Sequence, residues 1–180
     1  MQPMPTILRD LPEIEYLDGR AHRKVSPRLT HALVQSALLR VMADAAASRG
    51  VVVAELRVGL GAADRSKTEF VPDVSFISHE RLSRLSGEIR EKPPFSPDVA
   101  VEVRSPTDDL RYLARKIARY LATGSVLVLD VDPPARRIVA HAAGGVRIFG
   151  PGETFAHPAA PWLCFSIDSS FSDLDSPPSS

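Results

Sequence analysis

The sequence predicts a single α/β domain, in which helices flank a mixed β-sheet and extra strands lie at both ends of the chain. Residues 98–131 follow a strand–helix–strand pattern, which is typical of a parallel strand pair joined by a crossover helix. Residues 126–131 are almost wholly apolar, as in a strand that is buried on both faces. The length of 180 residues suits one compact domain.

Short strands and a helix precede this unit. Asp18-Gly19 is a turn dipeptide and predicts a tight connection after the first strand. Ser26-Pro27 predicts a helix start, with the serine as cap and the proline in the first turn. The expected elements are strands at residues 15–20 and 21–25, a helix at residues 26–48 closed by Gly50, and strands at residues 51–58 and 70–77.

The second helix and a hairpin complete the predicted domain. The run Ser-Pro-Thr-Asp at residues 105–108 resembles a capping box and predicts a helix that ends at Gly124. Gly144-Gly145 predicts a hairpin turn between strands at residues 136–141 and 146–149. The end of the chain is rich in serine, proline and aspartate. We therefore expect a domain over residues 11–168 and a disordered tail at residues 169–180.

Composition limits the classes of function. Lysine plus arginine and aspartate plus glutamate number 22 each, so any basic surface for nucleic acid must be local. The single cysteine, Cys164, excludes a disulfide framework and a cysteine zinc site, and its apolar neighbours predict a small buried residue. The first ten residues lack a signal-peptide pattern, and no apolar run is long enough for a bilayer. A soluble cytoplasmic protein is expected.

Two carboxylates in predicted strands are the first candidates for chemistry. Asp73 lies near the start of one strand and Glu102 lies within another. A buried carboxylate needs a partner; for Glu102 the spacing alone favours an ion pair with Arg104 or Arg57, and for Asp73 the alternative is an ordinary strand-start residue. If both carboxylates point to one position, they repel each other unless a cation lies between them. Their hard oxygen atoms suit Mg²⁺ or Mn²⁺, which also bind phosphate oxygens and activate water.

Lys116 is the third candidate. On a helical wheel it lies beside the apolar stripe, close to Tyr112 and Tyr120, where it can reach the sheet edge to which Glu102 points. A lysine there can orient a water molecule, or deprotonate it if the lysine pKa is lowered. The alternative is a solvated surface lysine.

Taken together, these residues resemble the Uma2 family, also called DUF820, a branch of the PD-(D/E)xK nuclease-like fold. The resemblance covers roughly residues 15–171 as an ordered set of short motifs. The matching pieces are residues 15–19, Ser26-Pro27, His31, residues 71–74, residues 101–108, Lys116, Tyr120, Gly124 and residues 131–133.

The resemblance implies a restriction-endonuclease-like core and metal-dependent endonuclease activity on phosphodiester bonds. It implies Asp73 and Glu102 as metal ligands and Lys116 as the catalytic lysine, moved from the strand to the helix. In the standard pattern the lysine follows the glutamate by two positions, and here that position holds Arg104, which cannot act as a base because it stays protonated.

Other residues are candidates for supporting roles. His31 either contributes to the site or packs at a helix terminus. Glu15 is a further metal ligand if the first strand borders the site, but a surface charge in a hairpin is the preferred interpretation. Arg104 is a further supporting candidate. Candidate contacts to a nucleic-acid backbone are Arg20, His22, Arg23, Lys24 and Arg28, and a second basic group, better explained as a solvated face, is Arg104, Arg111, Arg115 and Arg119.

Two classes of function remain open from the sequence. The first is a nuclease that cleaves DNA, with RNA or a damaged single strand as a weaker alternative substrate. The second is a catalytically silent nuclease-fold module that binds nucleic acid or a partner protein. A homodimer is expected in the first case because cutting both strands requires two sites.

Overall fold

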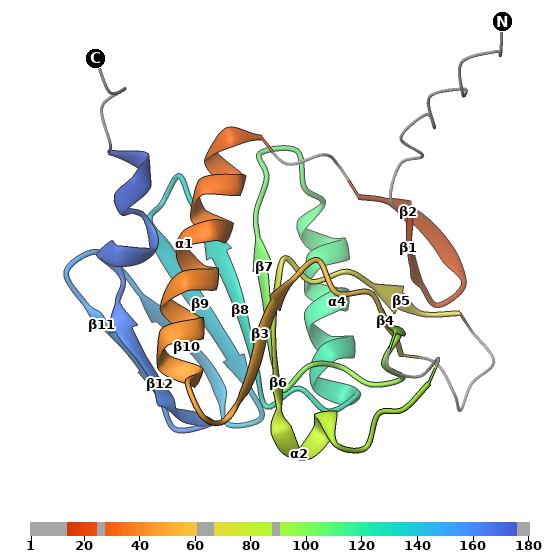
Figure 1. Cartoon of the computed structure of the whole chain (residues 1–180). Helices are drawn as coiled ribbons and strands as arrows, with labels where there is room; N and C mark the ends of the chain where they lie inside the picture. The colour runs from red at the N-terminus through yellow and green to blue at the C-terminus, as the bar shows by residue number, and fades with distance from the viewer. Residues whose placement is uncertain (1–13, 25–27, 61–66, 88–90, 176–180) are drawn as a thin grey trace, which may run out of the picture.

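The centre of the molecule is a six-stranded sheet. A computed structural model describes residues 14–24, 28–60, 67–87 and 91–175 (Figure 1). Along the sheet the strands are β10 (Gly145–Phe149), β9 (Arg137–Ala142), β8 (Leu127–Asp132), β7 (Val99–Val103), β6 (Val74–Ser78) and β3 (Gly50–Ala54). Only β7 and β8 pair in parallel, and every other neighbouring pair in this sheet is antiparallel. The predicted mixed sheet is confirmed.

Two helices cover opposite faces of this sheet. Helix α1 (Leu29–Ala46) packs on the face that carries Val99, Val101 and Val103. Helix α4 (Leu110–Ala122) connects β7 to β8 and packs on the other face, against Ala100 and Val128. Because side chains alternate along a strand, the residues between the valines of β7 point toward α4. Glu102 is one of these residues, and the crossover helix therefore lies on its side of the sheet.

A second, smaller sheet covers α4 from the outside. Its strands are β2 (Arg20–Arg23), β1 (Ile14–Leu17), β5 (Glu69–Phe70) and β4 (Val58–Gly59), in that order. Leu17 and Phe70 of this sheet share a buried core with Leu113 and Tyr120 of α4. The predicted N-terminal hairpin therefore packs on α4 as part of a second sheet.

The chain differs from the predicted strands around Asp73. Residues 70–77 do not form one strand: β5 ends at Phe70, and β6 begins at Val74. The predicted strand at residues 51–58 is likewise divided between β3 and β4. Gly50 belongs to β3 and does not close α1, which ends at Ala46. A glycine suits this position because a Cβ there would collide with the carbonyl oxygen of Ile77 on β6.

The helix ends also differ from expectation. Ser26-Pro27 lies outside the described residues, and α1 begins at Leu29. Helix α4 is capped by Asp109, whose carboxylate accepts hydrogen bonds from the backbone of Arg111 and Tyr112. The predicted capping run instead forms a turn in which the backbone N–H of Ser105 donates to Asp108, at 2.7 Å. A short helix, α2 (His79–Leu82), follows β6.

The predicted hairpin of residues 136–141 and 146–149 is present as β9 and β10, but the chain that follows it was not predicted correctly. A hairpin of β11 (Thr154–His157) and β12 (Ala160–Ser166) follows β10, and Cys164 is exposed on it rather than buried. The expected disordered tail is wrong for residues 169–175. They form two short 3-10 helices, η1 (Asp168–Ser170) and η2 (Ser172–Leu174), that contact α1, with Phe171 in the main core. Residues 176–180 lie outside the described part.

None of the helices in the described residues is long and apolar enough to cross a membrane.

The burial of Phe171 predicts a stability effect. Phe171 is 1 % exposed, so Phe171→Ala should lower the free energy of unfolding by about 3–5 kcal/mol, the usual cost of removing a buried aromatic side chain. Urea denaturation followed by circular dichroism measures this change. Ser172→Ala, at the exposed neighbouring position, should change it by less than about 0.5 kcal/mol. A loss below about 1 kcal/mol for Phe171→Ala would show that residues 169–175 do not belong to the cooperative core.

Candidate active site

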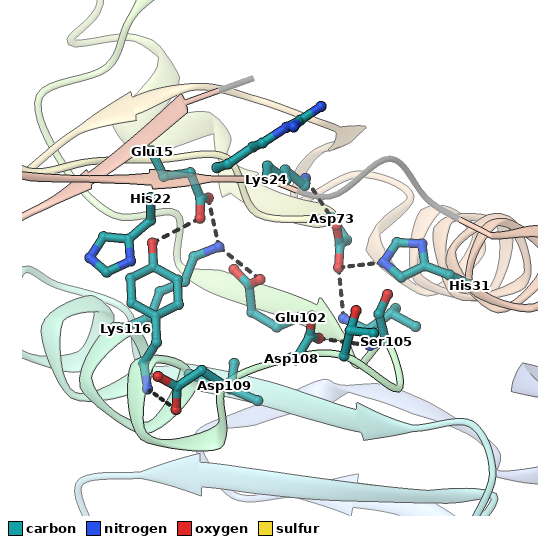
Figure 2. A pocket seen from close by; sticks show the side chains of 15 residues that line it. Glu15, His22, Lys24, His31, Asp73, Glu102, Ser105, Asp108, Asp109 and Lys116 are labelled. Carbon is teal, nitrogen blue, oxygen red and sulfur yellow. Dashed lines mark hydrogen bonds and ion pairs between the residues drawn. The ribbon is translucent and has the colours of Figure 1, made fainter. Parts of the chain in front are cut away.

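A cavity of about 270 Å³ lies between the two sheets, and charged side chains converge in it (Figure 2). Arg23, Asp108 and Asp109 are among the lining residues, and six further titratable side chains come from six separate segments of the chain. They are Glu15 from β1, Lys24 after β2, His31 from the first turns of α1, Asp73 before β6, Glu102 from β7 and Lys116 from α4.

Asp73 is fixed by the break between β5 and β6. Its backbone N–H donates to the carbonyl of Val101 at 3.0 Å, which holds the residue beside β7. Its side-chain Oδ2 accepts hydrogen bonds from the backbone N–H of Val103, at 2.7 Å, and from His31 Nε2, at 3.2 Å. Its other oxygen, Oδ1, lies 3.0 Å from Lys24 Nζ in an ion pair without hydrogen-bond geometry. Oδ1 therefore faces the ammonium group of Lys24, while Oδ2 accepts hydrogen bonds from a backbone amide and an imidazole.

The surroundings of Asp73 favour its ionised form. Burial alone would raise the pKa of Asp73, but the hydrogen bond from His31 and the positive charge of Lys24 outweigh burial and lower this pKa to about 2. The same contact acts on the imidazole. Burial opposes the charged form of His31, yet the hydrogen bond and the charge of Asp73 hold the pKa of His31 above its ordinary value. His31 thus has a partner in the site.

Glu102 and Lys116 form a buried ion pair. Lys116 Nζ donates to Glu102 Oε2 at 2.8 Å, and the hydroxyl of Tyr120 donates to Oε1 at 2.7 Å. Burial raises the pKa of Glu102 to about 7, although the charge of Lys116 acts in the opposite direction. The ion pairs considered for Glu102 from spacing alone are not made, since Arg104 and Arg57 lie elsewhere.

Glu15 is the second partner of Lys116. Lys116 Nζ also donates to Glu15 Oε1 at 2.7 Å, and Glu15 accepts further hydrogen bonds from the backbone of Val71 and the hydroxyl of Tyr112. Burial alone would lower the pKa of Lys116, but the charges of Glu102 and Glu15 raise this pKa above its usual range. Glu15 and Lys116 are each 3 % exposed, so the interpretations as a hairpin surface charge and a solvated lysine are wrong.

Lys24 pairs with the carboxylates of Asp73 and Glu55, although the sequence suggested that it contacts a nucleic-acid backbone. Its Nζ lies 2.6 Å from Glu55 Oε2 and donates to the carbonyl of Val71 at 2.9 Å. The amide of Gln35 joins the same group, donating to Glu55 Oε1 at 2.8 Å and to the carbonyl of Asp73 at 2.9 Å. Glu55 and Gln35 were not predicted as site residues, since neither lies in a recognisable sequence motif. The predicted helical positions of Tyr112 and Tyr120 beside Lys116 did indicate that these two residues lie near the site.

Arg104 is not brought into the cavity. Its guanidinium binds Asp130 and Asp132 on β8, with Nη2 2.5 Å from Asp130 Oδ2. Charge and hydrogen bonding from Asp130 raise the pKa of Arg104, which agrees with its exclusion as a base.

The remaining basic candidates divide between the cavity and the surface. Arg23 and His22 line the cavity, and the His22 ring stacks on Tyr112 with ring centroids 4.1 Å apart. Arg20 and Arg28 are exposed. On α4, Arg115 and Arg119 form ion pairs with Asp18 of the first hairpin, which supports a structural role for these two residues.

The chain resembles known proteins over most of its length. Residues 2–167 match the Uma2 family, described as "Putative restriction endonuclease". A solved structure of a "putative nuclease belonging to DUF820" from Anabaena variabilis superimposes with a TM-score of 0.78. The two chains are 25% identical, and the match covers 89% of this chain and 90% of the other. No curated protein matches the sequence. The predicted nuclease-like fold class is confirmed.

The lowered pKa of Asp73 predicts a loss of stability in acid. A carboxyl whose pKa falls from 3.8 to about 2 on folding stabilises the native state fully above pH 4. This contribution, on the order of 2 kcal/mol, is lost as the pH falls through 3.8 toward 2. The difference in unfolding free energy between wild type and Asp73→Asn should therefore shrink by that amount between pH 5 and pH 2.

Denaturant unfolding at a series of pH values measures this difference. Asp44→Asn, which removes an exposed carboxylate from α1, gives the background effect of losing one charge. A difference between wild type and Asp73→Asn that stays constant down to pH 2 would contradict the assigned electrostatic role of Asp73.

Proposed function

Because the chain belongs to the Uma2 family, we propose that it is a metal-dependent endonuclease that hydrolyses phosphodiester bonds in DNA. The observation that carries this proposal is the convergence of Asp73, Glu102 and Lys116 in one cavity. Burying two carboxylates and a lysine costs free energy, and ionisable groups with shifted pKa values that gather in one cavity are characteristic of functional sites. The likeness to a solved DUF820 protein adds support for a nuclease.

The proposed metal is Mg²⁺ or Mn²⁺, with Asp73 and Glu102 as the protein ligands. Asp73 Oδ1 is buried and accepts no hydrogen bond, as suits an oxygen that receives a cation. Within the described residues, no group of three or more His, Cys, Asp and Glu side chains stands ready to hold a metal ion. Mg²⁺ and Mn²⁺ are held through few protein carboxylates and fill the other positions with water and phosphate oxygens. When bound, such an ion would lower the pKa of water and stabilise negative charge on phosphate.

Lys116 is proposed to act as a fixed positive charge. Its raised pKa keeps it protonated, so it does not remove a proton from water while Glu15 and Glu102 are ionised. A protonated lysine can still orient a water molecule or stabilise the charge that develops on the phosphate. Of the two roles that the sequence left open for Lys116, we retain the orientation of water and drop its deprotonation. Proton removal is therefore proposed for a group other than Lys116.

The substrate is proposed to approach along the N-terminal hairpin. Arg23 lines the cavity and Arg20 projects from the same strand, while Arg28 lies exposed at the start of α1. Such groups would contact the phosphodiester backbone without reading the base sequence. The net charge of the chain is zero, so overall charge supplies no attraction for nucleic acid. The attraction is therefore proposed to come from this local basic group.

We also propose a homodimer, because cleavage of both DNA strands requires two sites. Strand β10 supports this proposal as an edge of the main sheet, where β9 is its one partner strand among the described residues. Its side chains Val146 and Ile148 are 59% and 63% exposed. An exposed edge strand with apolar side chains is a ready surface for pairing with a second copy.

The proposed activity predicts metal-dependent cleavage that depends on three side chains. Purified protein should nick or linearise plasmid DNA with Mg²⁺ or Mn²⁺ and lose activity when the metal is chelated. Asp73→Asn, Glu102→Gln and Lys116→Gln should each lower the rate by a factor of about 100 or more, the usual loss when a group that stabilises charge in the transition state is removed. Lys92→Gln, at an exposed lysine, is the matched control.

Each variant must be shown to be folded, since Lys116→Gln leaves Glu15 and Glu102 without their shared cation. Absence of cleavage by the wild type with every metal and with both DNA and RNA would favour the silent binding module. Cleavage that persists in all three variants would place the activity at another site.

The proposed dimer predicts a change of mass on substitution of its edge. Wild-type protein should elute with twice the mass of the chain in size-exclusion chromatography with light scattering. Ile148→Lys, which places a charge on the exposed face of β10, should yield a folded monomer. Thr154→Lys on β11 is the control, because that position is exposed on a different sheet. A monomeric wild type would exclude the dimer.

A further inference from the structure

We propose that Lys24 occupies the position of the divalent metal in the metal-free protein, and that Glu55 is a further ligand of that metal. The inference rests on the proposed metal-dependent function and concerns the same cavity. It assigns a role to two residues that the pair Asp73 and Glu102 leaves unexplained.

The surroundings of Lys24 Nζ are those of a bound cation. Three oxygen atoms from separate segments surround it: Glu55 Oε2 at 2.6 Å, the carbonyl of Val71 at 2.9 Å and Asp73 Oδ1 at 3.0 Å. Two carboxylates and a backbone carbonyl are a set of hard oxygen donors of the kind that Mg²⁺ and Mn²⁺ bind. The ammonium group thus lies where the protein gathers ligands for a cation.

The environment of Asp73 Oδ1 also points to a cation at this position. Its side chain is only 3% exposed, yet Oδ1 accepts no hydrogen bond, and within the described residues its only charged neighbour at ion-pair distance is Lys24. An unsatisfied buried carboxylate oxygen is costly, and a cation in direct contact offsets that cost. The other oxygen, Oδ2, already accepts two hydrogen bonds and is less available.

Glu55 is held toward Asp73 by its backbone and by Gln35. Its φ angle is 55°, in the left-handed region that non-glycine residues adopt rarely, and its N–H donates to the carbonyl of Asp73 at 3.3 Å. Gln35 occupies Oε1 of Glu55, which leaves Oε2 directed at the cation position. Strained backbone that is retained at a charged cluster is typical of functional residues. The orientation of Glu55 therefore suits a ligand more than an incidental surface charge.

Lys24 differs from Lys116 in its freedom to leave. Lys116 is held between Glu15 and Glu102, with 4% of its side chain exposed, whereas 15% of the Lys24 side chain is exposed. Lys24 follows the last residue of β2, so its backbone is not part of a strand. A metal ion entering the cavity can therefore replace the ammonium group of Lys24 while the pair around Lys116 stays intact.

The exchange of Lys24 for a metal ion explains how the carboxylates of Asp73 and Glu55 stay close together in the metal-free protein. In metal-free protein, Lys24 neutralises Asp73 and Glu55, which would otherwise repel each other in a partly buried position. On metal binding, one cation replaces another and the carboxylates keep their positions. The metal must compete with Lys24, so the lysine lowers the apparent metal affinity of the wild type.

The test measures Mn²⁺ binding to the full chain by isothermal titration calorimetry. Lys24→Met should bind Mn²⁺ at least tenfold more tightly than wild type because no internal cation competes. Glu55→Gln should bind at least fivefold more weakly because it loses a ligand oxygen with full charge. Lys92→Met, which removes an exposed lysine paired with Glu69, should bind within twofold of wild type.

A second measurement, on the wild-type protein, separates displacement of Lys24 by the metal from a general effect of charge on metal binding. Acetic anhydride labelling followed by peptide mass spectrometry should detect several-fold more acetylation of Lys24 with saturating Mn²⁺ than without it. Acetylation of Lys92 should be the same in both conditions. This arm needs no variant, so it stands even if Lys24→Met folds poorly.

The outcomes distinguish this inference from the proposed function. If Mn²⁺ binding is lost in Asp73→Asn but is equal in wild type and Lys24→Met, and labelling of Lys24 does not change, the metal site stands and the exchange is overturned. Weaker binding in Lys24→Met also overturns it, because Lys24 would then support the metal. If neither wild type nor Lys24→Met binds Mn²⁺, both the inference and the metal-dependent function are wrong.

Discussion

The ammonium group of Lys116 joins carboxylates that belong to two different sheets. Glu102 lies on β7 of the main sheet and Glu15 on β1 of the smaller one, and each accepts a hydrogen bond from Lys116 Nζ. Two buried carboxylates that contact the same ammonium group would repel each other in its absence. Taking either of them out of water is costly without an opposite charge. Helix α4 brings that charge because it crosses over β7 on the side to which Glu102 points. The hydrogen bond from Lys116 to Glu15 therefore ties the N-terminal hairpin to α4, in addition to the apolar contacts of Leu17.

The same network fixes the position of Asp73. Glu15 accepts a hydrogen bond from the backbone of Val71, inside the break between β5 and β6. Asp73 follows in that break and accepts a hydrogen bond from Val103 at the end of β7. A continuous strand would pair the backbone of residues 71–73 with a neighbouring strand and would direct the side chains alternately to both faces. The interruption frees Asp73 to turn its carboxylate toward the cavity, beside the end of β7.

Charge balance is a general feature of this cavity. Its three buried carboxylates, Glu15, Asp73 and Glu102, are matched by Lys24 and Lys116 together with His31, whose pKa is raised. The positive groups thus offset the negative charge of these carboxylates through direct contacts inside the cavity. This agrees with a chain whose net charge is zero, and it places the electrostatics relevant to function in local contacts rather than in overall composition.

The sequence by itself determined the strand–helix–strand unit of β7, α4 and β8, the mixed sheet and the three candidates Asp73, Glu102 and Lys116, because local periodicity and short motifs carry that information. Only the tertiary structure decided their partners. Glu15 and Lys116 are 101 residues apart in the chain, and no local pattern predicts a hydrogen bond across that separation. Whether Glu15 is buried, whether Lys24 faces DNA or Asp73, and whether residues 169–175 pack on α1 all depend on which surfaces the fold brings together. A charged residue is a surface group or a site residue according to its long-range neighbours, and those are fixed only when the chain has folded.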